Sequence, residues 1–507
     1  MASTRLDVWS FTDPWNATLD WYEKAVADLQ KLPIENPLSW RSLAAMHGID
    51  TAGWVAHGYL STGQVLPNLE DTFWNQCQHQ SWYFLPWHRG YLHRFEAIIR
   101  DTIIRLGGPK DWMLPYWNYN GKRPHSIELP MAFRSPKRPG NTPNHLFVKA
   151  RFGTDGKGNV NIDPARISLA ALREGDFDDD ATGGFAGPKT VFSLDGNRNG
   201  LLESLPHNVI HGFVGGAAVS QPTQWSQVGL MSTPQTAALD PIFWLHHANI
   251  DRLWEVWLNR HKDNKNPTTD TDWMQGPPAT GRKFLLPEVD GQIREVHVAD
   301  IMSAQALGYD YDDVSDPIPS VPGQPGAKPP GSLMGNVLGV LMASKAQEFA
   351  SSADRLYLGS EAGEARVRID AQSKPKVASL QGVGILQAPA PRVYLSLDGI
   401  QAKRDGGFSD AAVMDVYVAA PAASGQGGVE HFVGSVSMFG STRASDPNAA
   451  HGGAGITQAL DITDSYQALQ RSGALDGDEL TVKFRKATEV ADLSKISVGK
   501  VRLIHKP

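Results

Sequence analysis

A proline- and glycine-rich stretch divides the chain into two parts with different sequence patterns. Residues 315–332 read SDPIPSVPGQPGAKPPGS, a composition that favours an extended linker over a packed core. Before it, apolar residues recur at helical spacing, and after it, short β-branched runs alternate with turn residues. The sequence therefore predicts a multidomain protein with a domain at 1–314, a linker at 315–332 and a second domain at 333–507.

The first domain is predicted to be mainly helical, with long irregular loops. Helix start and stop signals bound several amphipathic segments. The expected helices are 15–31, 39–47, 86–106, 207–213 and 240–261. The segment 122–190 is rich in Pro, Gly and Asp, and we expect an extended surface loop there with little chemistry in it.

The second domain is predicted to be an all-β, sandwich-like domain. Its runs are short, β-branched or alternating, and turn residues separate them. The expected strands are 393–397, 413–418, 431–439, 479–484 and 500–505.

The charge balance excludes some partners. A net charge of -7 and a pI near 6.1 argue against a surface for nucleic acid or an anionic membrane. No apolar run reaches membrane-spanning length, and Met1–Ser10 shows no basic region followed by an apolar stretch. The one cysteine, Cys77, excludes an internal disulfide. We therefore expect a cytoplasmic protein; the sequence favours no particular oligomeric state.

The chemistry is concentrated in two histidine-rich clusters. The first contains His79 and His88, and the second contains His207, His211 and the pair His246-His247. His207 and His211 are four residues apart on a predicted helix, so both project from one face. Neutral imidazoles among apolar neighbours suit copper, zinc, iron or nickel. A zinc-protease motif would need Glu where Asn208 follows His207, and the Glu-x-x-His pairs of di-iron sites are missing here.

Three long motifs resemble the signatures of the tyrosinase and polyphenol oxidase family of type 3 copper proteins. They are FLPWHRGYLHRFE, LESLPHNVIHGFVGG and DPIFWLHHANIDRLWEVW, and the segment Gly308–Tyr311 resembles the tyrosine motif that closes the family's catalytic domain. The resemblance implies a four-helix bundle that holds two copper ions, with O2 as co-substrate and a small phenolic substrate.

The resemblance also implies the metal ligands. Copper A would be held by His47, His79 and His88, and copper B by His207, His211 and His247. His57 competes with His47 for the first position, and His47 is favoured because it ends a helix. His246 would lie outside the ligand set.

Further roles follow from the same resemblance. Glu203 and Asn208 match the pair proposed in the family to hold a water that takes the phenol proton. Cys77 has the spacing of a cysteine that forms a thioether to His79, although a lone cysteine is more often a small buried apolar group. Pro234, with Met231 nearby, takes the place of the family's bulky substrate gate and suggests an open mouth. Asp251 either orients a ligand imidazole or forms an ion pair with Arg89 or Arg252.

The implied activity is ortho-hydroxylation of monophenols and oxidation of o-diphenols to o-quinones. The second domain resembles the shielding domain of latent plant polyphenol oxidases, so we expect low activity until it is displaced, for example by a cut after about Asp313. Phe432, Met438 and Phe439 are candidate plugs or simply core residues. Two alternatives stay open at this point: an oxygen carrier of the haemocyanin type and a mononuclear zinc hydrolase that uses His207 and His211.

Overall fold

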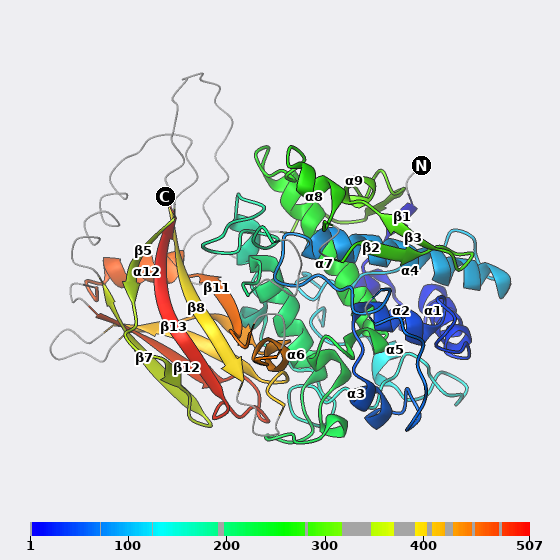
Figure 1. Ribbon diagram of the computed structural model, residues 1–507, viewed down its shortest axis with the longest axis horizontal. Coiled ribbons are helices and arrows are strands. Elements are labelled where there is room, and N and C mark those ends of the chain that lie inside the picture. Colours follow the sequence, from blue (N-terminus) through cyan, green and yellow to red (C-terminus); the bar gives the residue numbers. More distant parts are fainter. Residues whose placement is uncertain are drawn as a thin grey trace.

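The computed structural model describes most of the chain. The described residues are 3–70, 72–123, 125–190, 197–278, 282–316, 346–369, 391–402, 408–420, 429–448, 452–475 and 479–506. The predicted linker lies outside them, apart from Ser315 and Asp316. Figure 1 shows a helical part and a β-sheet part lying side by side, as the sequence predicts.

The helical part contains the predicted helices and several shorter ones. Its helices are α1 (Ala17–Leu29), α2 (Trp40–His47), α3 (Thr51–Ala56), α4 (Phe84–Arg105), α5 (Met131–Arg134), α6 (Val209–Gly215), α7 (Ile242–Arg260), α8 (Thr271–Gln275) and α9 (Val298–Ile301). Two small sheets complete it: β1 (Ser3–Arg5) with β4 (Tyr309–Tyr311), and β2 (Phe284–Pro287) with β3 (Ile293–Val296). No helix within the described ranges combines the length and apolar character needed to cross a membrane.

Helices α2, α4, α6 and α7 surround the centre of this part (Figure 1). Aromatic packing holds α4 against α7, since the Phe95 ring stacks on Trp244 with centroids 3.5 Å apart. Helix α2 starts at a serine N-cap, where Ser39 accepts a hydrogen bond from the Ser42 amide. Helix α4 begins at Phe84, two residues before the predicted start, and its apolar face is buried along almost its whole length.

Within the described residues, the C-terminal part is a nine-stranded sheet, in which all the pairings are antiparallel. Its strands are β5 (Gln347–Ser351), β6 (Leu356–Tyr357), β7 (Ala362–Ile369), β8 (Arg392–Ala402), β9 (Val413–Ala419), β10 (Glu430–Ser437), β11 (Ile456–Asp461), β12 (Glu479–Lys486) and β13 (Ile496–Lys506). The order is β10-β9-β12-β7-β5-β13-β8-β11, with β6 beside β13. The helices α11 (Ser441–Ala444) and α12 (Thr463–Arg471) accompany it. This confirms the predicted fold class, while the exact domain boundaries stay predictions.

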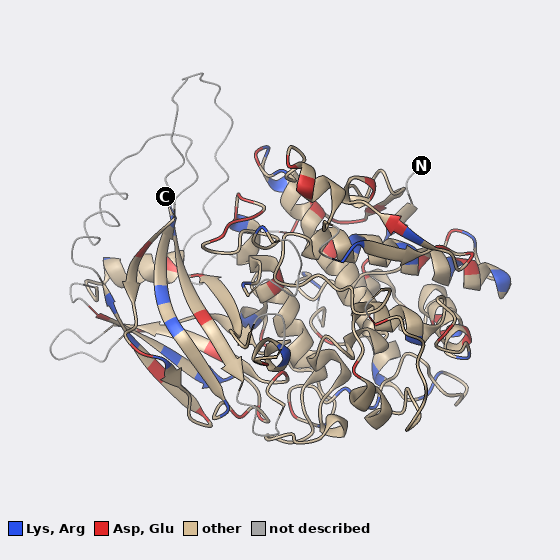
Figure 2. Ribbon diagram, in the orientation of Figure 1, with Lys and Arg blue, Asp and Glu red and all other residues tan. Residues whose placement is uncertain are grey.

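The segment 122–190 differs from the expected surface loop. It carries two short 3-10 helices, η2 (Pro164–Ile167) and η3 (Ala170–Arg173), and charged residues around them contact the sheet domain. Arg166 donates to Asp415 of β9 at 2.7 Å, and Lys506 of β13 donates to Glu174 at 2.8 Å. Figure 2 shows Lys, Arg, Asp and Glu interspersed over both parts of the chain. The segment therefore forms much of the polar contact between the two parts.

Candidate metal centre

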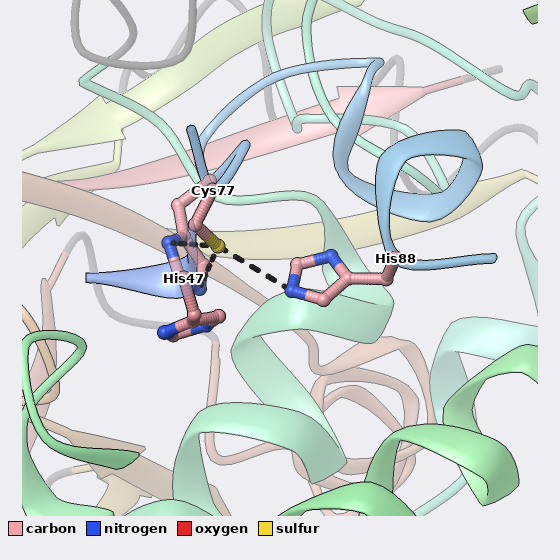
Figure 3. A group of neighbouring side chains, drawn as sticks. His47, Cys77 and His88 are labelled. Atoms are coloured by element: carbon pink, nitrogen blue, oxygen red, sulfur yellow. Dashed lines mark hydrogen bonds between the residues drawn. The ribbon is translucent and has the colours of Figure 1, made fainter. Parts of the chain in front are cut away.

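The first histidine group gathers where α2 ends and α4 begins. His47 is the last residue of α2, Cys77 and His79 lie in the loop before α4, and His88 is in the second turn of α4. One nitrogen or sulfur atom of each residue lies within 4.8 Å of those of the others. Figure 3 shows the Cys77 sulfur directed at the His88 ring, with His47 nearby. His57, the competing candidate, is at the end of α3 and outside this group.

The second histidine group lies between α6 and α7. It contains His207, His211, His246 and His247, again with one nitrogen of each within 4.8 Å of the others. The Nε2 atom of His247 is 3.3 Å from that of His207 and 3.4 Å from that of His211. The two groups adjoin, because the rings of His88 and His247 stack with centroids 4.4 Å apart. The structure thus brings all six predicted ligands together around one centre.

Oxygen acceptors hold Nδ1 of four of these imidazoles. The pairs are His47 with Pro234 O (2.8 Å), His88 with Phe84 O (2.7 Å), His207 with Asn208 Oδ1 (2.8 Å) and His211 with Met231 O (2.9 Å). An oxygen acceptor requires the proton on Nδ1, which leaves the Nε2 lone pair for a metal. The sequence-based gate residues Pro234 and Met231 therefore orient the imidazoles through their backbone carbonyls.

Burial keeps these imidazoles neutral. It lowers the pKa of His47 to about 4 and that of His207 to about 3. It also lowers the pKa values of His79, His88 and His247 well below 6.5, and neighbouring histidines lower them further. Neutral nitrogens whose lone pairs converge in a buried space require a cation to be stable together. The buried Nε2 of His47 has no hydrogen-bond partner among the described residues, so the donor set fits two metal ions that prefer imidazole, as copper does.

His246 is closer to the centre than the sequence indicated. Its ring stacks on His207 with centroids 5.2 Å apart, and it is fully buried. Neither of its nitrogens has a hydrogen-bond partner within the described part of the chain. Motif position alone gave no sign of this, because an adjacent residue on a helix points about 100° away.

The Cys77 sulfur faces the edge of the His79 ring. It lies 3.3 Å from Nδ1 and 3.7 Å from Nε2, so the ring carbon between these two nitrogens is turned toward it. Burial raises the pKa of the Cys77 thiol, with a further contribution from Glu203. The cysteine is buried, as a small apolar group would be, and at the same time placed beside a predicted ligand.

Glu203 and Asn208 line the same cavity as His47 and His79. This cavity has a volume of about 320 Å³. Both carboxylate oxygens of Glu203 accept from the Gln80 amide, at 3.0 and 2.9 Å, and burial raises the Glu203 pKa to about 8. Pro234 lines the cavity too, whereas the Met231 side chain is fully buried and is not part of the lining.

Asp251 forms an ion pair with Arg89, which is one of the arrangements expected for it. It accepts from Arg89 Nε at 2.5 Å and from Arg5 at 3.3 Å, and it is buried instead of lying on the helix surface. The hydroxyls of Tyr309 and Tyr311 donate to it at 2.6 and 2.5 Å. The tyrosine motif therefore closes the helical domain by capping a buried charge, and the structure gives Asp251 no contact with a ligand imidazole.

Comparison with known proteins decides the family. The common central domain of tyrosinase matches residues 37–165 and 172–260, and a domain of unknown function matches residues 345–506. A tyrosinase of Hahella sp. strain CCB-MM4 is 32% identical over 99% of this chain and 98% of its own length. The chain belongs to the tyrosinase family. It is therefore an oxidoreductase with two copper ions as cofactors, and the two histidine groups fit them.

Plant enzymes are also similar to this tyrosinase-family chain. A chloroplastic polyphenol oxidase of Malus domestica is 28% identical, and the match covers 79% of this chain and 62% of that enzyme. Among solved structures, latent apple tyrosinase superposes with a TM-score of 0.59 over 100% of this chain and 97% of its own, at 20% identity. A latent aurone synthase gives a TM-score of 0.61, over 100% of this chain and 90% of its own, at 18% identity. These structures show that the two-part fold is shared.

One expectation is corrected by these relatives. The sequence led us to expect a cytoplasmic protein, but the plant polyphenol oxidases that it resembles are named as chloroplastic enzymes. The cytoplasmic prediction was therefore wrong. It relied on the absence of a visible targeting signal in Met1–Ser10 and on the single cysteine, and neither observation establishes a compartment.

Proposed function

We propose that this enzyme uses O2 to hydroxylate monophenols at the ortho position and to oxidise o-diphenols to o-quinones. The family supports copper-dependent oxidation of small phenols, and the finer assignment is supported by one observation. A single cavity is lined both by predicted ligand imidazoles and by Glu203 and Asn208. When bound, the copper pair supplies the redox chemistry with O2. The chain holds the phenol and moves its proton.

Glu203 is the group best placed to accept that proton. A phenol has a pKa of about 10, so hydroxylation near neutral pH needs a base beside it. Glu203 lies in the cavity wall and is held by two hydrogen bonds from the Gln80 amide. The amide oxygen of Asn208 faces His207 at 2.8 Å, which leaves its NH2 group to hold a water. We assign the transfer to Glu203 through such a water.

The test is Glu203→Gln, which keeps an oxygen acceptor for the Gln80 amide but removes the base. We expect the rate of monophenol hydroxylation to fall by roughly 10²-fold or more, the usual contribution of a positioned base. The oxidation of an o-diphenol should change by less than about tenfold, because catechols ionise more readily. Oxygen uptake with a matched monophenol and diphenol measures both, with copper content as the control. Equal losses on both substrates would contradict the assignment.

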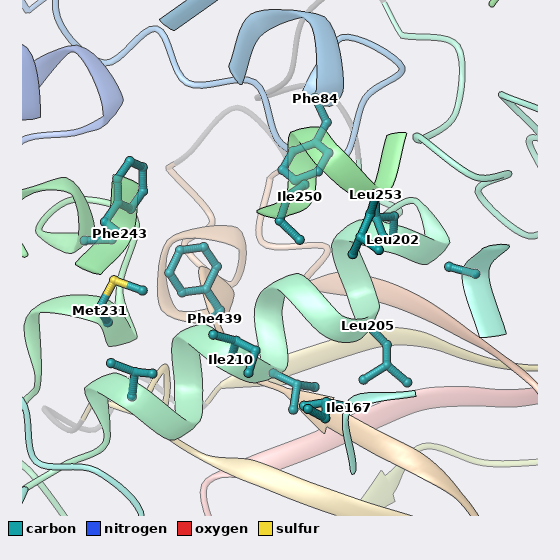
Figure 4. Packing of buried hydrophobic residues seen from close by; sticks show 14 of the residues in the cluster. Phe84, Ile167, Leu202, Leu205, Ile210, Met231, Phe243, Ile250, Leu253 and Phe439 are labelled. Atoms are coloured by element: carbon teal, nitrogen blue, oxygen red, sulfur yellow. The ribbon is translucent and has the colours of Figure 1, made fainter. Parts of the chain in front are cut away.

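Phe439 is the residue that we propose keeps the full chain latent. It follows β10 in the sheet domain, and its ring stacks on His211 with centroids 4.2 Å apart. It also meets His79 and His207 edge to face, at 5.7 and 5.9 Å. Figure 4 shows the ring between Met231 and Ile210 of the helical domain. The other candidates lie elsewhere: Phe432 packs on Tyr417 of β9, and Met438 is in the apolar core.

Removing the Phe439 ring should therefore release activity without cleavage. We expect Phe439→Ala to raise diphenol oxidation by the full chain severalfold, whereas Phe432→Ala, from the same strand region, should leave it unchanged. Cleavage after about Asp313 should give at least the same activity, because it lets the sheet domain leave. If the two alanine variants behave alike, the plug is not Phe439.

We also propose that Cys77 becomes joined to the ring carbon of His79 that faces it. Forming this thioether removes one hydrogen from each partner, and O2 takes up the two protons and two electrons as hydrogen peroxide. The peptide that contains both residues should then weigh less by two hydrogens after copper and air are supplied. Cys77→Ser should show no such loss. An unchanged mass in fully copper-loaded wild type would disprove the bond.

A further inference from the structure

The cavity over the metal centre is built by both domains. His47, His79, Glu203, Asn208 and Pro234 line it from the helical domain. A turn of the sheet domain forms another part of its wall and contributes Phe439, Gly440, Arg443, Ala444, Asp446 and Asn448. The sheet domain therefore does more than cover the site, because it contributes side chains to the space that a phenol would enter.

The turn that carries this wall is firmly anchored. The Asp410 carboxylate accepts from the Thr442 amide at 2.8 Å and from the Ser441 hydroxyl at 3.1 Å. The Ser445 hydroxyl donates to the Ser441 carbonyl at 2.7 Å and accepts from the Ala402 amide of β8 at 2.9 Å. The backbone between Phe439 and Ser445 is thus held at both ends, so any side chain on it is presented in a defined place.

Arg443 is the cation on that wall. It is exposed at the cavity, and no carboxylate among the described residues forms an ion pair with it, unlike most arginines of this chain. Neighbouring protein atoms lower its pKa by desolvation, and no carboxylate offsets this effect. A guanidinium remains charged under all ordinary conditions and offers a planar set of donors that matches a carboxylate.

We propose that Arg443 binds the carboxylate of an acidic phenol, so that the sheet domain selects phenolic acids for the copper site. This inference rests on the proposed phenol oxidation and names the substrate class. The cavity volume of about 320 Å³ suits one aromatic ring with a short acidic side chain. The hydroxyl end would face Glu203 and His79, and the acid would face Arg443 on the part of the wall that the sheet domain contributes. Asp446 adds a carboxylate to the same wall. Binding must therefore be measured with an anionic and with a cationic phenol.

The experiment measures binding to the copper-loaded full chain under argon, where no turnover occurs. The probes are para-hydroxyphenylacetate, its neutral amide and the cation tyramine, each titrated by calorimetry. We expect the acid to bind roughly tenfold or more tightly than the amide, as one charge-assisted pair provides. Arg443→Gln should abolish this preference, and Arg443→Lys should keep part of it.

The matched control is Arg366→Gln, from an exposed arginine on β7 of the same domain. It should leave all three affinities unchanged, and melting temperatures should show that both glutamine variants are folded. The proposal is overturned if wild type binds acid and amide alike, if tyramine binds best, or if Arg443→Gln weakens acid and amide equally. A full acid preference, together with no oxygen uptake in air by Phe439→Ala or by the chain cut after about Asp313, would instead count against the proposed reaction and leave Arg443 as a carboxylate site.

Discussion

At the residue scale, the adjacent histidines His246 and His247 of α7 present different parts of their rings to the metal centre. Nε2 of His247 points at Nε2 of both His207 and His211, at 3.3 and 3.4 Å. His246 instead presents a ring face to His207, and its nitrogens have no partner among the described residues. The geometry therefore favours His247 as the copper B ligand, in agreement with the motif.

This difference predicts distinct metal contents for two matched variants. We expect His247→Gln to lose one of the two copper ions, because the third nitrogen of the copper B group is removed. His246→Gln should keep both, since its ring contacts are not ligand bonds. Copper per chain, measured by elemental analysis on folded protein, decides between them. The reverse pattern would make His246 the ligand.

The motifs predicted which imidazoles meet, but not what orients them. His47 and His211 are held by the backbone carbonyls of Pro234 and Met231. A carbonyl gives no side-chain signal in a sequence, and the segment that carries both residues is irregular apart from a short 3-10 turn. The ion pair of Asp251 with Arg89 was expected, but its second partner, Arg5, was missed because it lies 246 residues away.

At the scale of elements, the buried charges around Asp251 join four of them. Arg5 is on β1, Arg89 on α4, Asp251 on α7, and Tyr309 and Tyr311 on β4. Removing the Asp251 carboxylate would leave the buried guanidinium groups of Arg5 and Arg89 with less negative charge beside them. Asp251→Asn should therefore lower the free energy of unfolding by about 3–5 kcal/mol.

The control for this prediction is an exposed pair on the same helix as Arg89. Asp101 and Arg105 on α4 form an i,i+4 pair at 3.1 Å with both side chains well exposed. Asp101→Asn should cost less than about 1 kcal/mol. Urea unfolding of both variants at one copper loading measures the two values. Similar losses would show that the buried network contributes little to stability.

The turn that carries Phe439 and Arg443 predicts a pH dependence. Burial raises the pKa of Asp410 from 3.8 to about 6. Because the folded-state pKa is the higher one, this group favours folding most below pH 4, and that contribution is lost as the pH rises to about 6. Asp410→Asn keeps the acceptor for Thr442 without the charge. It should therefore be more stable than wild type at pH 7, by at most about 3 kcal/mol.

Unfolding curves of Asp410→Asn and wild type between pH 4 and pH 7 test this prediction. The difference between the two proteins should shrink toward zero at the acidic end. A constant difference, or a less stable variant at pH 7, would mean that the carboxylate is well compensated in the fold and that the hydrogen bond to Thr442 dominates.

The elements themselves were predictable where their pattern is strong. Helices α1, α4 and α7 carry long amphipathic faces, and β9 and β12 are rich in valine and other strand formers. In the sheet domain, strands β5, β6, β7 and β11 were missed. The sequence of β7, AGEARVRI, begins with small and charged residues, and β11, ITQALD, places a buried glutamine in its centre. Such strands gain their stability from neighbours in the sheet, which a single sequence does not show.

At the scale of the whole molecule, the sequence predicted two parts but not how they dock. The contact includes aromatic pairs, Phe439 with His211 and Phe408 with Trp225, together with charged residues that look ordinary in their local sequence. Glu174 is buried and accepts from Lys506 at 2.8 Å and from the Tyr394 hydroxyl at 2.7 Å, both from the sheet domain. Lys506 also meets Asp176 and Asp179, at 2.7 and 3.4 Å. These contacts hold the sheet domain where Phe439 can reach the copper site.

Lys506 should therefore control latency at a distance from the metal. In Lys506→Met the Glu174 carboxylate loses its cation, which weakens docking and should raise diphenol oxidation by the uncut chain severalfold.

The control is Lys500→Met on the same strand, β13. Lys500 forms its ion pair with Glu348, which also belongs to the sheet domain. It should leave latency unchanged. Weaker docking should also let a protease cut the Lys506→Met variant faster after about Asp313. If Lys506→Met stays latent while Phe439→Ala is active, the ring alone blocks the site and the charged contact serves only stability.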